Sequence, residues 1–433
     1  MHYSGHQKLG IKPAVFVLIL GLLAGQARPA DDGPLPGINL TGLSSGFSLK
    51  IMENPVPSFY TFSLQSEQSP SAAKIPDWLS GIKMSAILEG ESRIQKFTDV
   101  TNIESNGSSD LYLRDFQFYI ESTLMENVTA SAVIITEWLG DDVNQGDGII
   151  GLDQATIEAN PGKIPVYLVL GKRTQPFGIF QNHLLMDPMT KDAYETKKVK
   201  LTFGYSGPVD FNITIYKGTE QMDHLLDSGL FGTGIVMRND PDVRNVGSFI
   251  LSVAPIKLLD SLQVFAAFLS EPGWNSRNTT LDLGFSLQPA SFKHLMIDGE
   301  YVKALARELY TPLDQAIKEG VISLSATYHF IVRKRKNIGS GSFRLRRSQI
   351  ESHPLSFCIR VEHFDDDGLT ERLPTWSVNN RMSLGGNWTF SQVGNFIIYG
   401  GLEFRRSTYR VNPDFQEMRS QNSELYLLLG ITY

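Results

Sequence analysis

The sequence predicts an all-β protein in which about sixteen antiparallel strands close into a transmembrane barrel. Three observations lead to this prediction. Apolar and polar residues alternate along many short segments, the connections between them are alternately short and long, and aromatic residues lie near the connections. In a membrane barrel one face of each strand meets lipid and the other meets water, so a hydrophobic share of 42% is compatible with membrane insertion.

The alternating residues define the candidate strands. Segments 198–205 (KVKLTFGY) and 281–288 (LDLGFSLQ) carry an apolar side chain at every second position, the period of a strand with one apolar face. The predicted strands are 81–92, 112–124, 127–138, 152–159, 166–173, 194–205, 208–218, 245–255, 260–270, 278–288, 293–304, 321–333, 354–364, 376–390, 393–406 and 421–433.

The connections between these strands are short and long in turn. Outer-membrane barrels have tight periplasmic turns and longer outer loops, and an even strand number places both ends of the barrel on the periplasmic side. The last strand ends on Tyr433, which resembles the C-terminal insertion signal of bacterial outer-membrane barrels. The predicted long loops are 93–111, 139–151, 174–193, 219–244, 305–320 and 407–420, with shorter ones at 271–277 and 365–375.

One basic segment does not fit this alternation. Residues 334–353 (KRKNIGSGSFRLRRSQIESH) fall where a short periplasmic turn is expected. Either the strand count is wrong nearby, or the segment is a periplasmic extension. Its charges are interpreted as solvated, with anion binding as the alternative.

The N-terminal residues 1–30 have the features of a secretory signal peptide. Two lysines precede an apolar run, 14–24, which is too short for a bilayer that requires about twenty residues. Cleavage is expected after Ala27 or Ala30. Residues 31–78 show little periodicity and are predicted to be a periplasmic leader, and residues 79–433 to form the barrel.

Composition excludes several functional classes. The net charge of −7 becomes −10 without the three basic residues of the signal peptide, so nucleic-acid binding is not expected. The single cysteine, Cys358, excludes an internal disulfide and is predicted to be a packing residue without a redox role. The sequence contains none of the serine-hydrolase, zinc-protease, P-loop or Rossmann motifs, so no enzyme activity and no cofactor are predicted.

Charged residues inside the predicted strands must face water, because Lys or Arg facing lipid at mid-depth costs about 2–4 kcal/mol. The long loop 174–193 is predicted to fold inward, where its prolines and glycine would fix its bends. Charges of both signs predict weak ion selectivity; alternatively, each charge solvates the wall and pairs with a neighbour. A single histidine among scattered carboxylates does not predict a metal site. The candidate pore and constriction residues are His183, Asp187, Lys191, Asp192, Lys198, Lys200, Arg360, Glu362, Arg381, Glu403 and Arg405.

Residues 171–190 (GKRTQPFGIFQNHLLMDPMT), followed by ETKK, carry a family resemblance. They resemble a segment of the LbtU-like, legiobactin-receptor-type family of outer-membrane siderophore porins. SGIKMSAILEGES, SSDLYLRDFQFYIES and IITEWLGDDV resemble the first barrel strands of that family, so the resemblance covers about Trp78 to Tyr205. The chain departs from the family at 191–198 (KDAYETKK), where the lysines replace an expected arginine. This departure concerns the ligand more than the fold.

The resemblance implies a porin-like barrel of the bacterial outer membrane, without a plug, that passes an iron chelate or a similar small solute. Together with the strand pattern it predicts passive uptake of a small polar solute, with a ferric siderophore as one candidate. The other expected contacts are outer-membrane lipid and lipopolysaccharide, and a homotrimer is left open. Two alternatives are a closed barrel whose loops 219–244 and 407–420 bind a host or phage partner, and a barrel hydrolase that uses scattered serines and histidines.

Overall fold

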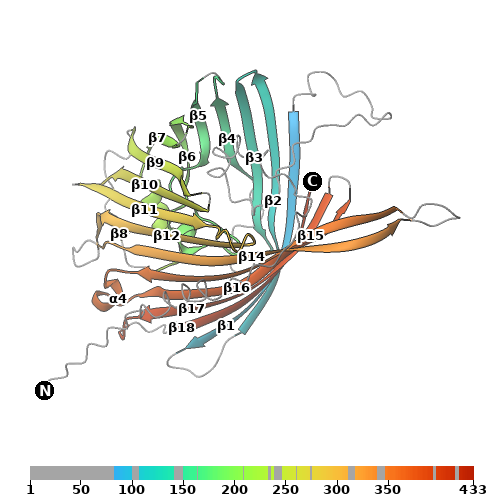
Figure 1. Cartoon of the computed structure of the whole chain (residues 1–433). Coiled ribbons are helices and arrows are strands. Elements are labelled where there is room, and N and C mark those ends of the chain that lie inside the picture. The colour runs from blue at the N-terminus through green and yellow to red at the C-terminus, as the bar shows by residue number, and fades with distance from the viewer. Residues whose placement is uncertain are drawn as a thin grey trace. The chain divides into compact units, whose positions relative to one another are not determined.

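Figure 1 shows the computed structural model, a β-barrel whose strands are all antiparallel to their neighbours. The predicted signal peptide and leader lie outside the residues that the structure describes. These residues are 82–99, 107–140, 150–162, 164–207, 209–232, 236–237, 246–259, 261–273, 276–310, 317–338, 347–393, 396–414 and 419–433.

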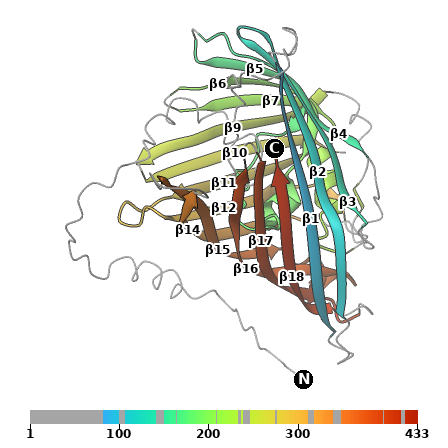
Figure 2. The same cartoon turned by 90° about the vertical axis from the view of Figure 1, so that its right-hand side faces the viewer.

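Sixteen strands form one closed sheet, which confirms the predicted fold class. The first strand pairs with the last from Ile87↔Thr432 to Asp99↔Arg419, and this pairing closes the barrel (Figure 2). The strands are β1 (Ile82–Asp99), β2 (Gly107–Met125), β3 (Val128–Leu139), β4 (Gly151–Ala159), β5 (Val166–Thr174), β6 (Lys197–Tyr205), β7 (Phe211–Lys217), β9 (Val246–Leu259), β10 (Leu262–Pro272), β11 (Arg277–Leu287), β12 (Leu295–Ala306), β14 (Gly320–Ile338), β15 (Arg347–Asp365), β16 (Trp376–Val393), β17 (Phe396–Val411) and β18 (Arg419–Thr432).

The two faces of the barrel wall differ as the alternation predicts. Along β7, Phe211, Ile213 and Ile215 are exposed on the outer face, whereas Asn212 and Thr214 are buried inside. A soluble sheet would bury the apolar set instead, so this inside-out pattern requires an apolar environment around the barrel. Among the described residues, none of the helices is long and apolar enough to cross a membrane.

The basic segment 334–353 prolongs two neighbouring strands. β14 and β15 stay paired from Gly320↔Asp365 to Ile338↔Arg347, and the strand count remains sixteen. Their other neighbours, β12 and β16, stop pairing at Tyr328 and Leu355, so the rest of the hairpin is a two-stranded ribbon that projects beyond the barrel wall (Figure 1). These strand ends were not predicted, because residues 334–353 show no regular apolar alternation in the sequence.

Within the described ranges, three short helices lie in the connections between strands: α2 (Met189–Tyr194), α3 (Glu220–Asp227) and α4 (Leu369–Arg372). Segment 219–244 was expected to be an outer loop. Its first part instead packs inside the barrel, since Met222 and Leu225 of α3 are fully buried in a cluster with wall residues such as Leu269. Two shorter strands, β8 (Val236–Met237) and β13 (Leu309–Tyr310), pair with each other apart from the barrel sheet.

Close packing inside the wall gives a test of the strand register. Gly204 on β6 faces its register partner Tyr167 on β5, and a Cβ at position 204 would lie 1.9 Å from Tyr167 Cζ. Gly204→Ala should displace the ring and cost about 1–3 kcal/mol, which would lower the unfolding temperature in detergent. Gly247→Ala is the control, because a Cβ there meets nothing within 4 Å. Equal unfolding temperatures for the two variants would contradict this packing.

Candidate functional site

A long connection between β5 and β6 crosses the interior of the barrel. Gln175 N–H donates to Thr196 O (2.9 Å), so the two ends of the connection stay together while residues 176–195 leave the wall. Gly178 has a positive φ of 88°, and a Cβ there would lie 2.2 Å from the Phe180 ring. Only glycine fits this bend. Residues 175–196 are called the inner loop below.

Apolar side chains fix one side of the inner loop. Phe177, Phe180, Met189 and Tyr194 are buried in a cluster that also contains α3 and inward-facing wall residues. Phe177 and Tyr194 meet edge to face, with ring centroids 6.4 Å apart. The cluster therefore forms a hydrophobic core within the barrel, where a water-filled channel would otherwise lie.

Carboxylates on the far wall bind the backbone of the inner loop. Glu300 on β12 accepts hydrogen bonds from Ile179 N–H (2.7 Å) and Phe180 N–H (3.1 Å). Glu403 on β17 and Glu362 on β15 hold two further amides: Met186 N–H donates to Glu403 Oε2 (2.7 Å), and Met189 N–H to Glu362 Oε1 (2.6 Å). Charge-assisted bonds of this kind are stronger than neutral ones, so three wall strands fix the path of the loop.

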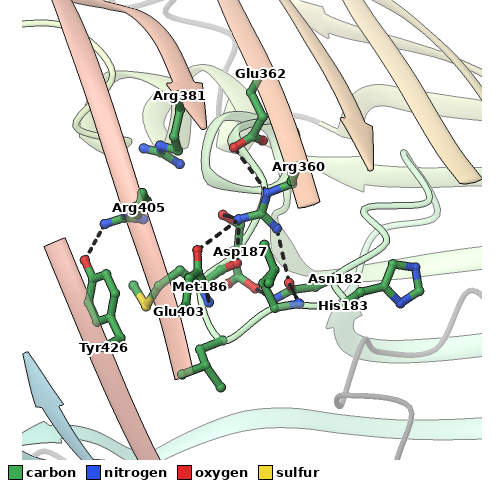
Figure 3. A network of polar contacts seen from close by, with 12 residues as sticks. Asn182, His183, Met186, Asp187, Arg360, Glu362, Arg381, Glu403, Arg405 and Tyr426 are labelled. Atoms are coloured by element: carbon green, nitrogen blue, oxygen red, sulfur yellow. Dashed lines mark hydrogen bonds and ion pairs between the residues drawn. The ribbon is translucent and has the colours of Figure 1, made fainter. Parts of the chain in front are cut away.

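The guanidinium of Arg360 on β15 donates hydrogen bonds to carbonyl oxygens of the inner loop, as Figure 3 shows. Its Nη2 donates to Met186 O (2.8 Å) and Asp187 O (3.0 Å), and its Nη1 donates to Asn182 Oδ1 (3.2 Å). The guanidinium also pairs with Glu362, with Nε 3.2 Å from Oε2. Because the wall binds both backbone N–H and C=O groups within residues 182–189, this part of the loop is anchored at several points.

His183 is an anchor of the same kind. Its Nε2 lies 2.8 Å from Asp298 Oδ2 on β12, and its ring lies 6.4 Å from that of His329. Asn387 on β16 donates to His183 O (3.2 Å). Within the described ranges no group of three or more His, Cys, Asp or Glu side chains is placed to hold a metal ion.

Lys191 organises the opposite, open side of the inner loop. Its Nζ lies 3.0 Å from Asp187 Oδ2 and 3.6 Å from Glu195 Oε2. Burial favours a raised pKa for Asp187, but Lys191 and Arg114 outweigh this effect and lower the pKa. Burial disfavours the charged form of Lys191, yet the adjacent carboxylates raise its pKa. Both groups therefore remain ionised at neutral pH.

The other predicted pore residues lie against the wall or beneath loops. Lys198 pairs with Glu220, Lys200 donates to Thr174 O, and Arg381 pairs with Asp192 (2.6 Å). Arg405 Nε lies 2.8 Å from Glu424 Oε2, and its Nη2 donates to Tyr426 OH (2.5 Å). The structure thus brings four predicted wall residues, Arg360, Glu362, Arg381 and Glu403, into contact with the inner loop, which carries His183, Asp187, Lys191 and Asp192. Lys198, Lys200 and Arg405 contact other groups.

An open cavity of about 190 Å³ remains between the inner loop and strands β1 to β4. Of the predicted residues, Asp187 and Lys191 line it. Sequence reasoning missed the wall residues Glu89, Asp115 and Glu137, which also line it. All three lie in predicted strands, so counting alternate positions could have assigned them to the inner face.

Solved structures with this architecture are outer-membrane proteins. The outer membrane channel DcaP of Acinetobacter baumannii matches with a TM-score of 0.50 at 9% identity, covering 81% of this chain and 97% of that one. Salmonella typhi OmpF, in complex with daunomycin, matches with a TM-score of 0.50 at 12% identity over 81% and 97%. The chain has the porin fold.

A third barrel, Pseudomonas putida OprB, has a TM-score of 0.52 at 8% identity and covers 82% of this chain and 94% of that one. Identities this low establish the fold alone. No protein-family model matches the sequence. No curated protein matches it either.

The anchoring of the inner loop is testable through amide hydrogen exchange. Glu362→Ala removes the acceptor for Met189 N–H and leaves Arg360 without this partner, at a cost of about 1–3 kcal/mol. Exchange at residues 182–189 should accelerate by about 5- to 150-fold. Glu362→Gln, which keeps an acceptor oxygen, should have a smaller effect.

The control for this experiment is Glu220→Gln, which removes only the partly exposed ion pair with Lys198. Exposed pairs contribute little, so exchange at 182–189 should stay at the wild-type rate. Unchanged exchange in Glu362→Ala would show that the wall carboxylate does not hold the loop.

Proposed function

We propose that the protein is a passive channel of the bacterial outer membrane that takes up small polar solutes. The observation that carries this proposal is the inner loop, which crosses the lumen and leaves a water-accessible cavity along β1 to β4. In this proposal the anchored loop narrows the path without closing it. Pore diameter and the groups that line it then determine which solutes pass.

A ferric siderophore is one proposed solute. The support for it is that the family-like motif at 171–190 spans the end of β5 and most of the inner loop, so the resemblance falls on the part of the chain that shapes the passage. In this proposal residues 1–30 direct export and residues 31–78 precede the barrel. Association into a trimer is compatible with the exposed apolar wall and is proposed on that basis alone.

Shortening the inner loop tests the channel. Because Gln175 and Thr196 are hydrogen-bonded, residues 176–195 can be replaced by Asn-Gly, which forms a two-residue hairpin turn that preserves the β5–β6 ladder. The wild-type protein should give discrete conductance steps in planar bilayers, and the shortened variant should give larger ones because its lumen is wider.

The control for this variant is Glu126→Gln, in the tight turn between β2 and β3 outside the cavity lining, which should keep the wild-type step size. A protein that inserts into the bilayer and stays silent, with or without the loop, would contradict the proposed function.

A further inference from the structure

The open cavity carries an excess of negative charge. Six carboxylate side chains and three cationic side chains line it. Each cation already lies within ion-pair distance of a carboxylate: Lys197 Nζ is 2.8 Å from Asp153 Oδ1, Lys191 Nζ is 3.0 Å from Asp187 Oδ2, and Arg114 Nε is 3.8 Å from Glu89 Oε2. The lining cations are therefore occupied by neighbours within the wall and the loop.

Two of the lining carboxylates, those of Asp115 and Glu137, form no salt bridge among the described residues. Asp115 Oδ2 accepts a hydrogen bond from Gln117 Nε2 (2.5 Å), and its buried Oδ1 has no hydrogen-bond partner among the described residues. Glu137 is exposed toward the cavity. Asp115 and Glu137 are therefore the two lining acids that no cation of the wall or the inner loop pairs with among the described residues.

The register places three of the acids side by side. Glu89 on β1 is directly opposite Asp115 on β2, and Asp115 is directly opposite Glu137 on β3. Directly opposed like charges destabilise a sheet. Asn or Gln at positions 115 and 137 would remove the repulsion and still form hydrogen bonds, so the stability of the sheet does not account for these two charges. Glu89 is held by Arg114 (3.8 Å) and by Tyr399 OH (2.6 Å). A row of acids across three strands does create a negative potential along one wall of the passage.

Low-dielectric walls strengthen such a potential, because they focus field lines into the aqueous path. We propose that the acid row formed by Glu89, Asp115 and Glu137 makes the passage selective for cations. Its preferred solutes are small organic cations that carry amine or guanidinium groups, ahead of neutral and anionic solutes of the same size. This inference rests on the proposed channel function. A ferric chelate that uses the passage would then have a neutral or positive net charge.

The acid row differs from a metal site. Among the described residues no group of three or more candidate ligands converges on one point, and the acids lie along adjacent strands. Carboxylates spread along a wall attract a cation in transit without enclosing it, as conduction requires.

Reversal potentials in planar bilayers under a KCl gradient test the proposal. We expect the wild-type channel to favour K⁺ over Cl⁻ by at least about fivefold, because one unit negative charge at about 4 Å in water raises the local K⁺ concentration by about that factor and also lowers that of Cl⁻. Asp115→Asn and Glu137→Gln should each lower this ratio, and the double variant should bring it close to one. Glu126→Gln, a charge change outside the cavity lining, should keep the wild-type ratio.

Two further measurements on the wild-type protein do not depend on the folding of the variants. Raising the salt concentration from 0.1 to 1 M shortens the screening length from about 10 to about 3 Å, so the preference for K⁺ should weaken. In liposome-swelling assays the rate should fall in the order lysine, glutamine, glutamate, which are solutes of similar size.

The outcomes separate this inference from the proposed function. A conducting channel that prefers Cl⁻, or one whose K⁺ preference is unchanged in a folded double variant, would contradict cation selection by the acid row. The proposed channel function would remain supported. A protein that inserts and never conducts overturns both. Faster swelling with glutamate than with lysine likewise overturns the proposed solute class.

Discussion

The interaction on which the interior of this barrel depends is the hydrogen bond from a loop amide to a carboxylate of the wall. Glu300, Glu362 and Glu403 accept such bonds from the inner loop, and Glu271 on β10 accepts two from the first turn of α3, Gln221 N–H (2.9 Å) and Met222 N–H (3.3 Å). A carboxylate at a helix N-terminus also interacts favourably with the helix dipole. The same chemistry thus holds two separate segments inside one lumen.

This anchoring determines where open space remains in the lumen. The anchored segments bring apolar side chains such as Phe180 and Met222 together into a core on one side of the lumen. Once that side is packed, the open space lies beside β1 to β4, where the lining is polar. The barrel therefore combines an interior hydrophobic core, an apolar outer wall and a polar cavity, all enclosed by a single layer of strands.

The sequence predicted all sixteen strands because a strand between lipid and water must alternate its side chains, and that constraint is local. The prediction of strand bounds failed in segments where this constraint does not apply. The prolonged ends of β1 and β2 and the ribbon formed by β14 and β15 lack a regular apolar face, so their polar residues read as loops. Residues 220–231 were assigned to an outer loop because the helix is short, and its small apolar face, Met222 and Leu225, does not reveal from sequence that it packs inside the lumen.

The roles of individual charges required the register. Arg360, Glu362 and Glu403 were assigned to the lumen by alternation, but only the fold shows that they bind the backbone of a loop more than 150 residues away in sequence. From the sequence, charges of both signs in the lumen predicted weak ion selectivity. The structure separates charges that anchor the loop from those that line the cavity, and Asp115 and Glu137 become neighbours only through strand pairing.

The most direct test of the account compares two thiols. Cys358 on β15 is buried beside the anchoring residues, whereas a cysteine introduced as Glu137→Cys would face the cavity. With a charged, membrane-impermeant thiol reagent, we expect rapid modification at position 137, a change in conductance, and no reaction at Cys358. Rapid labelling of Cys358 together with a protected position 137 would mean that the inner loop does not divide the lumen in this way.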